Sequence, residues 1–191
     1  MDKLSTYDIA WKGLSEGSHQ FDFDINDDFF AAFEGSEIKG GELTATVNMH
    51  KSSRLLTFET RINGNVITEC DRCLGRLSLP VDYSGVLQVK FSDEPADYDG
   101  EIMWLHPDEG TVPLAQYIYE SIVLSLPYRR IHGTDSEGHS LCDSDMLARF
   151  SIVDAEAFDT MTANDSTTLA DTMEGEKLRQ LKAMIEDKTE K

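Results

Sequence analysis

Hydrophobic and polar residues alternate along much of the first half of the chain. In residues 18–25, for example, Phe21, Phe23 and Ile25 alternate with polar residues. A period of two residues is typical of a strand with one buried face. On this basis, strands are predicted at residues 3–12, 18–25, 43–49 and 56–62.

Between the second and third of these strands, the residue types indicate a short helix. Asn26 is a favourable capping residue. The carboxylates of Asp27 and Asp28 would be stabilised at the positive N-terminal end of a helix. Gly35 is typical of the position just past a helix end. We therefore predict a helix that begins after Asn26 and ends before Gly35.

The dipeptide Asn63-Gly64 predicts a tight hairpin turn after the fourth strand. Both central positions of such a turn favour a positive φ, which Asn and Gly adopt readily. Further extended segments are predicted at residues 66–69 and 77–91. The acidic residues 92–100 are predicted to form a loop.

A longer helix is predicted at residues 113–126, where apolar residues follow the helical period. Pro113 suits the first helical position, and Pro127 ends the helix because proline lacks an N–H and its ring clashes with the preceding turn. Residues 154–175 are rich in Asp, Ser, Thr and Ala, which indicates a linker or a disordered stretch. An apolar stripe predicts a final helix at residues 176–187.

Together these elements predict an α+β fold. We expect a β-rich antiparallel sheet or a partly closed barrel, with two or three helices and a small site similar to a zinc knuckle. The predicted β-rich domain covers residues 1–150, and residues 151–191 are predicted to form an acidic linker and a C-terminal helix. A chain of 191 residues is long enough to bury a substantial core.

The chain is strongly acidic, with 17 Lys and Arg residues, 36 Asp and Glu residues and a formal net charge of −19. Such a charge repels nucleic acid and anionic membranes at long range, which excludes a generally basic nucleic-acid binder. However, residues 51–90 hold six bases against four acids. The composition is therefore compatible with a local basic surface. No segment has the length and hydrophobicity of a membrane span or of a secretory signal, and we expect a cytoplasmic protein without a membrane partner.

The candidate chemistry lies in cysteine and histidine residues. Cys70 and Cys73 form a C-x-x-C motif, and a downstream segment contains His132, His139 and Cys142. Three sulfurs and one nitrogen make a closed structural zinc site, which either histidine can complete. The alternatives are ordinary thiols with solvated histidines, or thiol redox chemistry. Redox chemistry is disfavoured because the residues after Cys73 do not begin a helix that would stabilise a thiolate.

Two stretches of the sequence resemble a known family. They are T-E-C-D-R-C at residues 68–73 and E-S-I-V-L-S-L-P-Y-R-R-I-H at residues 120–132. Over residues 20–150 the chain is similar to the YceD-like family, bacterial proteins linked to accumulation of large-subunit ribosomal RNA. The resemblance implies a non-catalytic ribosome-biogenesis factor that binds a metal and contacts nucleic acid. It also implies the metal ligands, which would be Cys70, Cys73, His132 and Cys142, with His139 as an alternative ligand and zinc as the expected cofactor.

Four arginines accompany these candidate ligands in the sequence, namely Arg72, Arg76, Arg129 and Arg130. If the two motifs meet around one ion, the arginines converge and can contact phosphates, and Tyr128 can stack on a base. The expected partner is then ribosomal RNA or a pre-ribosomal particle. The alternative is that these arginines pair with neighbouring carboxylates.

The acidic surface supports a second hypothesis, a protein–protein adaptor that binds basic ribosomal proteins without contacting RNA. We do not expect an enzyme, because the sequence contains no H-E-x-x-H or Walker-type glycine-rich motif.

Overall fold

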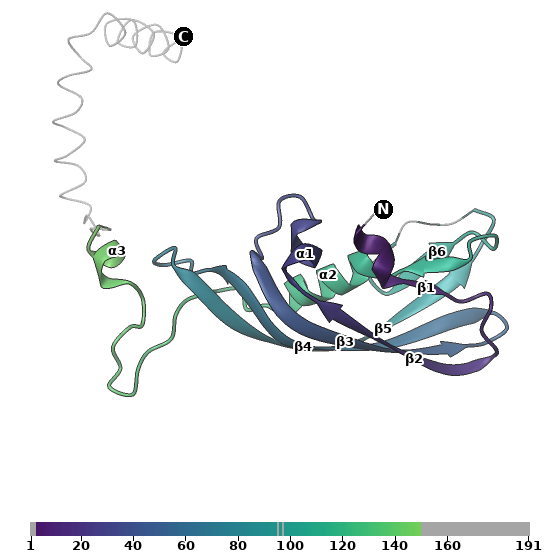
Figure 1. Ribbon diagram of the computed structural model, residues 1–191, viewed down its shortest axis with the longest axis horizontal. Coiled ribbons are helices and arrows are strands. Elements are labelled where there is room, and N and C mark those ends of the chain that lie inside the picture. The colour runs from purple at the N-terminus through teal and green to yellow at the C-terminus, as the bar shows by residue number, and fades with distance from the viewer. Residues whose placement is uncertain (1–2, 95, 97, 150–191) are drawn as a thin grey trace, which may run out of the picture. The chain divides into compact units, whose positions relative to one another are not determined.

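Five strands form the main sheet of the structure, a computed structural model that describes residues 3–94, 96 and 98–149. These strands are β2 (Gly17–Ile25), β3 (Gly40–Lys51), β4 (Leu55–Glu69), β5 (Arg76–Phe91) and β6 (Ile102–Leu105). Their order in the sheet follows their order in the chain, and neighbours are antiparallel except for β5 and β6, which are parallel (Figure 1). A second, two-stranded sheet pairs β1 (Asp8–Ala10) with β7 (Thr111–Pro113).

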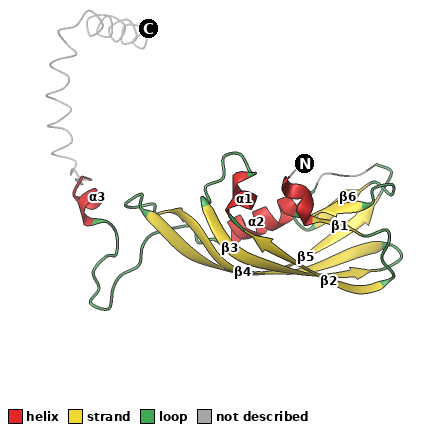
Figure 2. Cartoon of the chain, in the orientation of Figure 1, coloured by secondary structure: helices red, strands yellow, loops and turns green. Residues whose placement is uncertain are grey.

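The helices have between 5 and 11 residues. They are the 3-10 helix η1 (Lys3–Tyr7) and the α-helices α1 (Asp27–Ala31), α2 (Ala115–Ser125) and α3 (Ser144–Arg149). Figure 2 shows α1 and α2 on the same side of the main sheet. The compact unit that contains both sheets ends at Met146.

The hydrophobic core lies where α1 and α2 cover the main sheet. Along β3, every second side chain is at most 3% exposed and faces this core, as the sequence pattern predicts; these residues are Leu43, Ala45, Val47 and Met49. The helices contribute Phe29 and Phe30 from α1 and Ile118 and Ile122 from α2. Burial of these side chains on one face of each element is the main driving force for this fold.

The predicted fold class is confirmed, because the structure combines a mostly antiparallel sheet with short helices. Of the two predicted forms, a sheet and a partly closed barrel, the described residues form the sheet, and they do not close into a barrel. The predicted capping of α1 is also confirmed, since the Asn26 side chain accepts a hydrogen bond of 3.0 Å from the Asp28 amide. The predicted division between residues 1–150 and 151–191 stays a prediction, and the predicted linker and final helix lie outside the described residues.

The strand predicted at residues 3–12 is largely wrong. This segment forms η1 followed by the three residues of β1. Tyr7 is buried against Phe29, with ring centroids 4.7 Å apart, and its hydroxyl donates to the Asp24 carbonyl at 2.9 Å. Tyr7 therefore contacts α1 and β2 through its side chain, and only residues 8–10 pair as a strand.

The hairpin turn predicted at Asn63-Gly64 is wrong. Both residues lie inside β4, where Gly64 pairs with Leu43 on one side and Val81 on the other. Gly64 has a φ of +147°, and a Cβ at this position would lie 2.3 Å from the carbonyl oxygen of Glu42. The glycine therefore permits a close approach of two strands rather than a turn.

The predicted long helix is shorter than expected at its N-terminal end. Pro113 is the last residue of β7, and α2 begins at Ala115. Pro127 follows the end of the helix as predicted, because the residue before a proline avoids the helical conformation and Leu126 is extended.

Candidate metal centre

The first two candidate ligands lie in the turn between β4 and β5. Two backbone hydrogen bonds close this turn, from the Leu74 amide to the Cys70 carbonyl at 2.9 Å and from the Cys70 amide to the Gly75 carbonyl at 2.8 Å. Leu74, rather than Gly75, has the positive φ, at 58°. The two cysteine side chains are buried, whereas Leu74 is exposed.

The other two ligands come from the segment that follows α2. This segment is joined to the turn by a pair of hydrogen bonds: the Asp71 amide donates to the Arg130 carbonyl, and the Arg130 amide donates to the Asp71 carboxylate, both at 2.7 Å. Further along, the Leu141 amide donates to the Gly133 carbonyl at 3.0 Å. The segment therefore folds back on itself, which brings Cys142 close to His132.

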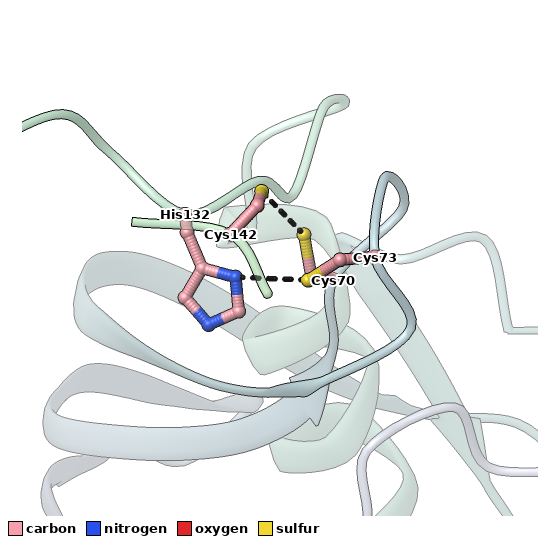
Figure 3. Close-up of side chains that lie close together, drawn as sticks. All are labelled: Cys70, Cys73, His132 and Cys142. Carbon is pink, nitrogen blue, oxygen red and sulfur yellow. Dashed lines mark hydrogen bonds between the residues drawn. The ribbon is translucent and has the colours of Figure 1, made fainter. Parts of the chain in front are cut away.

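The four ligand atoms converge on one point. One ligand atom of each of Cys70, Cys73, His132 and Cys142 lies within 4.8 Å of all the others. The Cys70 and Cys142 sulfurs are 3.8 Å apart, and the Cys73 sulfur is 3.4 Å from Nδ1 of His132 (Figure 3).

These separations fit a tetrahedral zinc site. Zn–S bonds of about 2.3 Å and a Zn–N bond of about 2.0 Å place two ligand sulfurs about 3.8 Å apart, and a sulfur and a nitrogen about 3.5 Å apart. The observed contacts of 3.8 Å and 3.4 Å agree with these values. The residues present therefore fit a zinc ion.

The orientation of the His132 ring supports this interpretation. Its Nε2 lies 3.1 Å from the carbonyl oxygen of Arg76, to which an Nε2–H donates. That hydrogen bond places the lone pair on Nδ1, the atom that faces the Cys73 sulfur. A histidine that binds a metal is commonly oriented by a hydrogen bond of this kind.

The environment of Cys70 and Cys73 favours thiolates, which are the form that binds metals. Burial raises the pKa of Cys70, but hydrogen bonds from the backbone amides of Cys73, Arg72 and His132 outweigh it and lower that pKa to about 6. The pKa of Cys73 is lowered by the amides of Asp143 and Gly75. For Cys142, the Ser140 hydroxyl lowers the pKa, but burial and the neighbouring cysteines raise it overall.

His139, the alternative ligand, lies outside this cluster. Its side chain is 74% exposed, and its Nδ1 faces the carboxylates of Asp135 at 3.4 Å and Glu137 at 3.7 Å. Of the two candidate histidines, the structure therefore places His132 with the three cysteines.

The four candidate arginines have different surroundings. The Arg130 side chain is 21% exposed, and its guanidinium lies 2.7 Å from Glu37 and 3.6 Å from Asp71. Arg72, Arg76 and Arg129 are exposed, and none of them takes part in an ion pair within the described part of the chain. The alternative prediction, that the arginines pair with neighbouring carboxylates, therefore holds for Arg130.

Tyr128 is fully exposed at 102%, next to these arginines in the sequence. The sequence did not reveal that Glu37, about 30 residues before the C-x-x-C motif, joins this region through Arg130. The sequence shows charged residues of both signs, but it does not show which of them form ion pairs.

The fold and this cluster together define an α+β protein with a closed candidate metal centre of three sulfurs and one nitrogen. Residues 58–149 match the family described as large ribosomal RNA subunit accumulation protein YceD. The match confirms the family resemblance predicted from the sequence, and it includes all four candidate ligands.

The description of the family is that of an accumulation factor rather than a catalyst. No curated protein and no solved structure matches the chain. Among the described residues, no helix combines the length and the apolar character needed to cross a membrane.

Proposed function

We propose that the protein is a non-catalytic factor of ribosome biogenesis that supports accumulation of large-subunit ribosomal RNA in the cytoplasm. In this proposal it contacts RNA, or a pre-ribosomal particle, through a surface that a zinc ion organises. The family description supports the process. The convergence of the four candidate ligands, which joins the β4–β5 turn to the segment after α2, is the observation that carries the mechanism.

Cys70, Cys73, His132 and Cys142 would hold the ion. Bound zinc would supply a structural cross-link between two parts of the chain that are far apart in sequence. Four protein ligands leave no open position for a substrate or a reactive water, which supports a structural role rather than a catalytic one.

The proposed RNA surface consists of Arg72, Arg76, Arg129 and Tyr128. Arg72 lies between the two cysteines of the turn, Arg76 provides the carbonyl that orients His132, and Arg129 precedes the segment that carries His132. Three arginines that have no carboxylate partner among the described residues can bind phosphates, and an exposed tyrosine can stack on a base. We do not include Arg130, because Glu37 and Asp71 already neutralise it.

A salt titration of binding to purified large-subunit ribosomal RNA tests this surface. Replacing one phosphate-contacting arginine by alanine should reduce the slope of log affinity against log salt by about 0.7–0.9. Arg61→Ala, at an exposed position inside β4, is the matched control and should leave the slope unchanged. Unchanged slopes for Arg72→Ala, Arg76→Ala and Arg129→Ala would remove the RNA surface from the proposal.

The metal is tested separately by elemental analysis of protein purified under reducing conditions without chelator. We expect about one zinc per chain, and its loss in a variant in which Cys70 and Cys73 are both replaced by serine. Protein that contains no metal would contradict the zinc site but not the family role.

The net charge of −19 favours a second candidate function, an adaptor for basic ribosomal proteins that does not touch RNA. Crosslinking in living cells followed by purification with and without RNase separates the two. Partners that disappear with RNase support RNA contact, whereas partners that persist support the adaptor.

A further inference from the structure

Leu74, in the turn that carries two candidate ligands, has an unusual backbone conformation. Its φ is 58°, and among the described residues it is the one residue other than glycine with a positive φ. Glycine adopts this conformation without strain, whereas any side chain makes it costly. Burial of the leucine side chain does not offset this cost, since Leu74 is 58% exposed. A strained residue with an exposed apolar side chain indicates a role in binding rather than in stability.

Leu74 lines a pocket of about 440 Å³ at one end of the main sheet. The β4–β5 hairpin projects beyond the start of β3, because Gly40 of β3 pairs with Ile67 and β4 continues to Glu69 (Figure 1). The lining of the pocket comes from α1, the start of β3, the end of β4 and the turn that follows. Its volume lies in the range of pockets that hold small organic groups.

Hydrogen bonds hold the walls of this pocket in place. The Lys39 amide donates to the Ile67 carbonyl at 2.8 Å, which fixes the chain before β3 to β4. The Gly41 amide donates to the Asp27 carboxylate, also at 2.8 Å, which fixes the start of α1 to β3. A pocket that is formed before its ligand enters costs little conformational entropy on binding.

Two cations line the pocket, Lys39 and Arg76, and both are exposed. Neither takes part in an ion pair within the described part of the chain. An exposed cation without a carboxylate partner can bind a phosphate group. Because Arg76 also belongs to the proposed RNA surface, the pocket is continuous with that surface.

The other side chains of the lining suit a nucleobase. Asp27 and Glu69 provide carboxylates, which accept hydrogen bonds from the exocyclic amino group of a base such as cytosine. Ile67 and Leu74 provide apolar contacts, which can pack against the faces of a flat ring. A nucleotide combines these properties, because it is anionic at its phosphate and donates hydrogen bonds from its base.

We infer that this pocket binds an unpaired nucleotide of RNA. The base packs against Ile67 and Leu74, and the phosphate contacts Lys39 or Arg76. A base inside a duplex cannot enter, because its edge is paired and its faces are stacked on its neighbours. The assignment rests on the proposed RNA contact, and it names single-stranded segments as the RNA that this surface selects.

Fluorescence anisotropy of the full chain with labelled RNA oligonucleotides tests this site. A single-stranded cytosine oligonucleotide should bind at least about tenfold more tightly than an RNA duplex of the same length. It should also bind more tightly than a uracil oligonucleotide, whose base has no exocyclic amino group. Lys39→Ala should reduce the slope of log affinity against log salt by about 0.7, whereas Arg61→Ala should leave the slope unchanged.

Two variants of Leu74 separate binding from stability. Leu74→Gly should be at least as stable to urea as Leu74→Ala, because glycine alone adopts this φ without strain. Both variants should keep the metal content of the parent protein, yet bind the cytosine oligonucleotide at least about fivefold more weakly. Leu141→Ala is the matched control. Leu141 is 59% exposed beside another candidate ligand but does not line the pocket, so this variant should bind as the parent protein does.

Three results would overturn the assignment: unchanged affinity in both Leu74 variants, equal affinity of the parent protein for duplex and single strand, or equal affinity for free cytidine monophosphate and the oligonucleotide. If Arg72→Ala and Arg129→Ala still lower the salt slope, these results leave the proposed RNA surface in place. Absence of binding to every RNA would remove both.

Position 74 can also be tested in cells. A photocrosslinking amino acid at this position should form adducts with RNA that RNase digests, and the same amino acid at position 141 should form fewer. RNase-resistant adducts with a protein at position 74 would identify a protein-docking site and contradict the assignment.

Discussion

Removing zinc from the proposed metal centre should loosen one segment of the protein without unfolding its sheet. The core between the main sheet and the helices α1 and α2 does not include the candidate ligands. By contrast, the segment from Arg130 to Cys142 is held to the β4–β5 turn by a small number of contacts. Chelation of zinc should therefore affect this segment first.

The size of the effect follows from those contacts. Two hydrogen bonds join Asp71 and Arg130, and a third joins His132 to the Arg76 carbonyl. At about 1 kcal/mol each, they contribute about 3 kcal/mol, which corresponds to roughly hundredfold protection of the segment against opening. With zinc bound, opening also requires release of metal ligands, which raises the protection further.

Hydrogen exchange followed by mass spectrometry measures this difference. Chelation should speed exchange in peptides that cover residues 130–142 at least about tenfold, while peptides from β3 and β4 change by less than about twofold. Cys73→Ser should reproduce the effect without chelator. An equal increase across β3 and β4, or no increase in residues 130–142, would refute the reasoning.

Three further predictions concern the fold. Ile118→Ala should lower the free energy of unfolding in urea by about 2–5 kcal/mol because Ile118 is fully buried, whereas Leu124→Ala on the same helix should change it little. Gly64→Ala should destabilise the protein by about 1–3 kcal/mol in the same assay, while Gly13→Ala, whose Cβ would meet no atom within 4 Å, should not. Burial, together with the charge of Glu120, raises the pKa of Tyr98 from its ordinary value of 10.0 to about 12. The unfolded chain therefore loses this proton first, and stability should fall as the pH rises from 10 towards 12, less steeply in Tyr98→Phe.

Much of the main sheet could be predicted from the sequence because one face of each strand is buried or half-buried. Alternation of apolar and polar residues marks such strands directly, as in β2 and β3. The turn prediction failed at Asn63-Gly64. A glycine that allows two strands to approach closely cannot be distinguished in the sequence from a glycine in a turn, because the difference lies in its neighbours in space. The strands β6 and β7 were missed because segments of four and three residues are too short to show a period.

The candidate ligands could be proposed because thiols and imidazoles are few and chemically distinctive. The sequence could not by itself choose between His132 and His139, which depends on how the segment after α2 folds back onto the β4–β5 turn. It also could not separate Arg130 from Arg129, although they are adjacent. Only the position of Glu37 and Asp71 in space shows that one of them is paired.

The pairing of β1 with β7 affects the order in which the protein can be completed during synthesis. Ile9 pairs with Val112, and the amide of Trp11 donates to the carbonyl of Gly110, so the first strand has no partner until more than a hundred residues have been made. The hairpins from β2 to β5 need only local contacts and can form earlier, since contacts close in sequence form fastest. The N-terminal segment can therefore pair only after β7 has been synthesised. By then, the central sheet has already had time to form. A fusion partner or truncation at the N-terminus would accordingly disturb the last step of folding rather than the first.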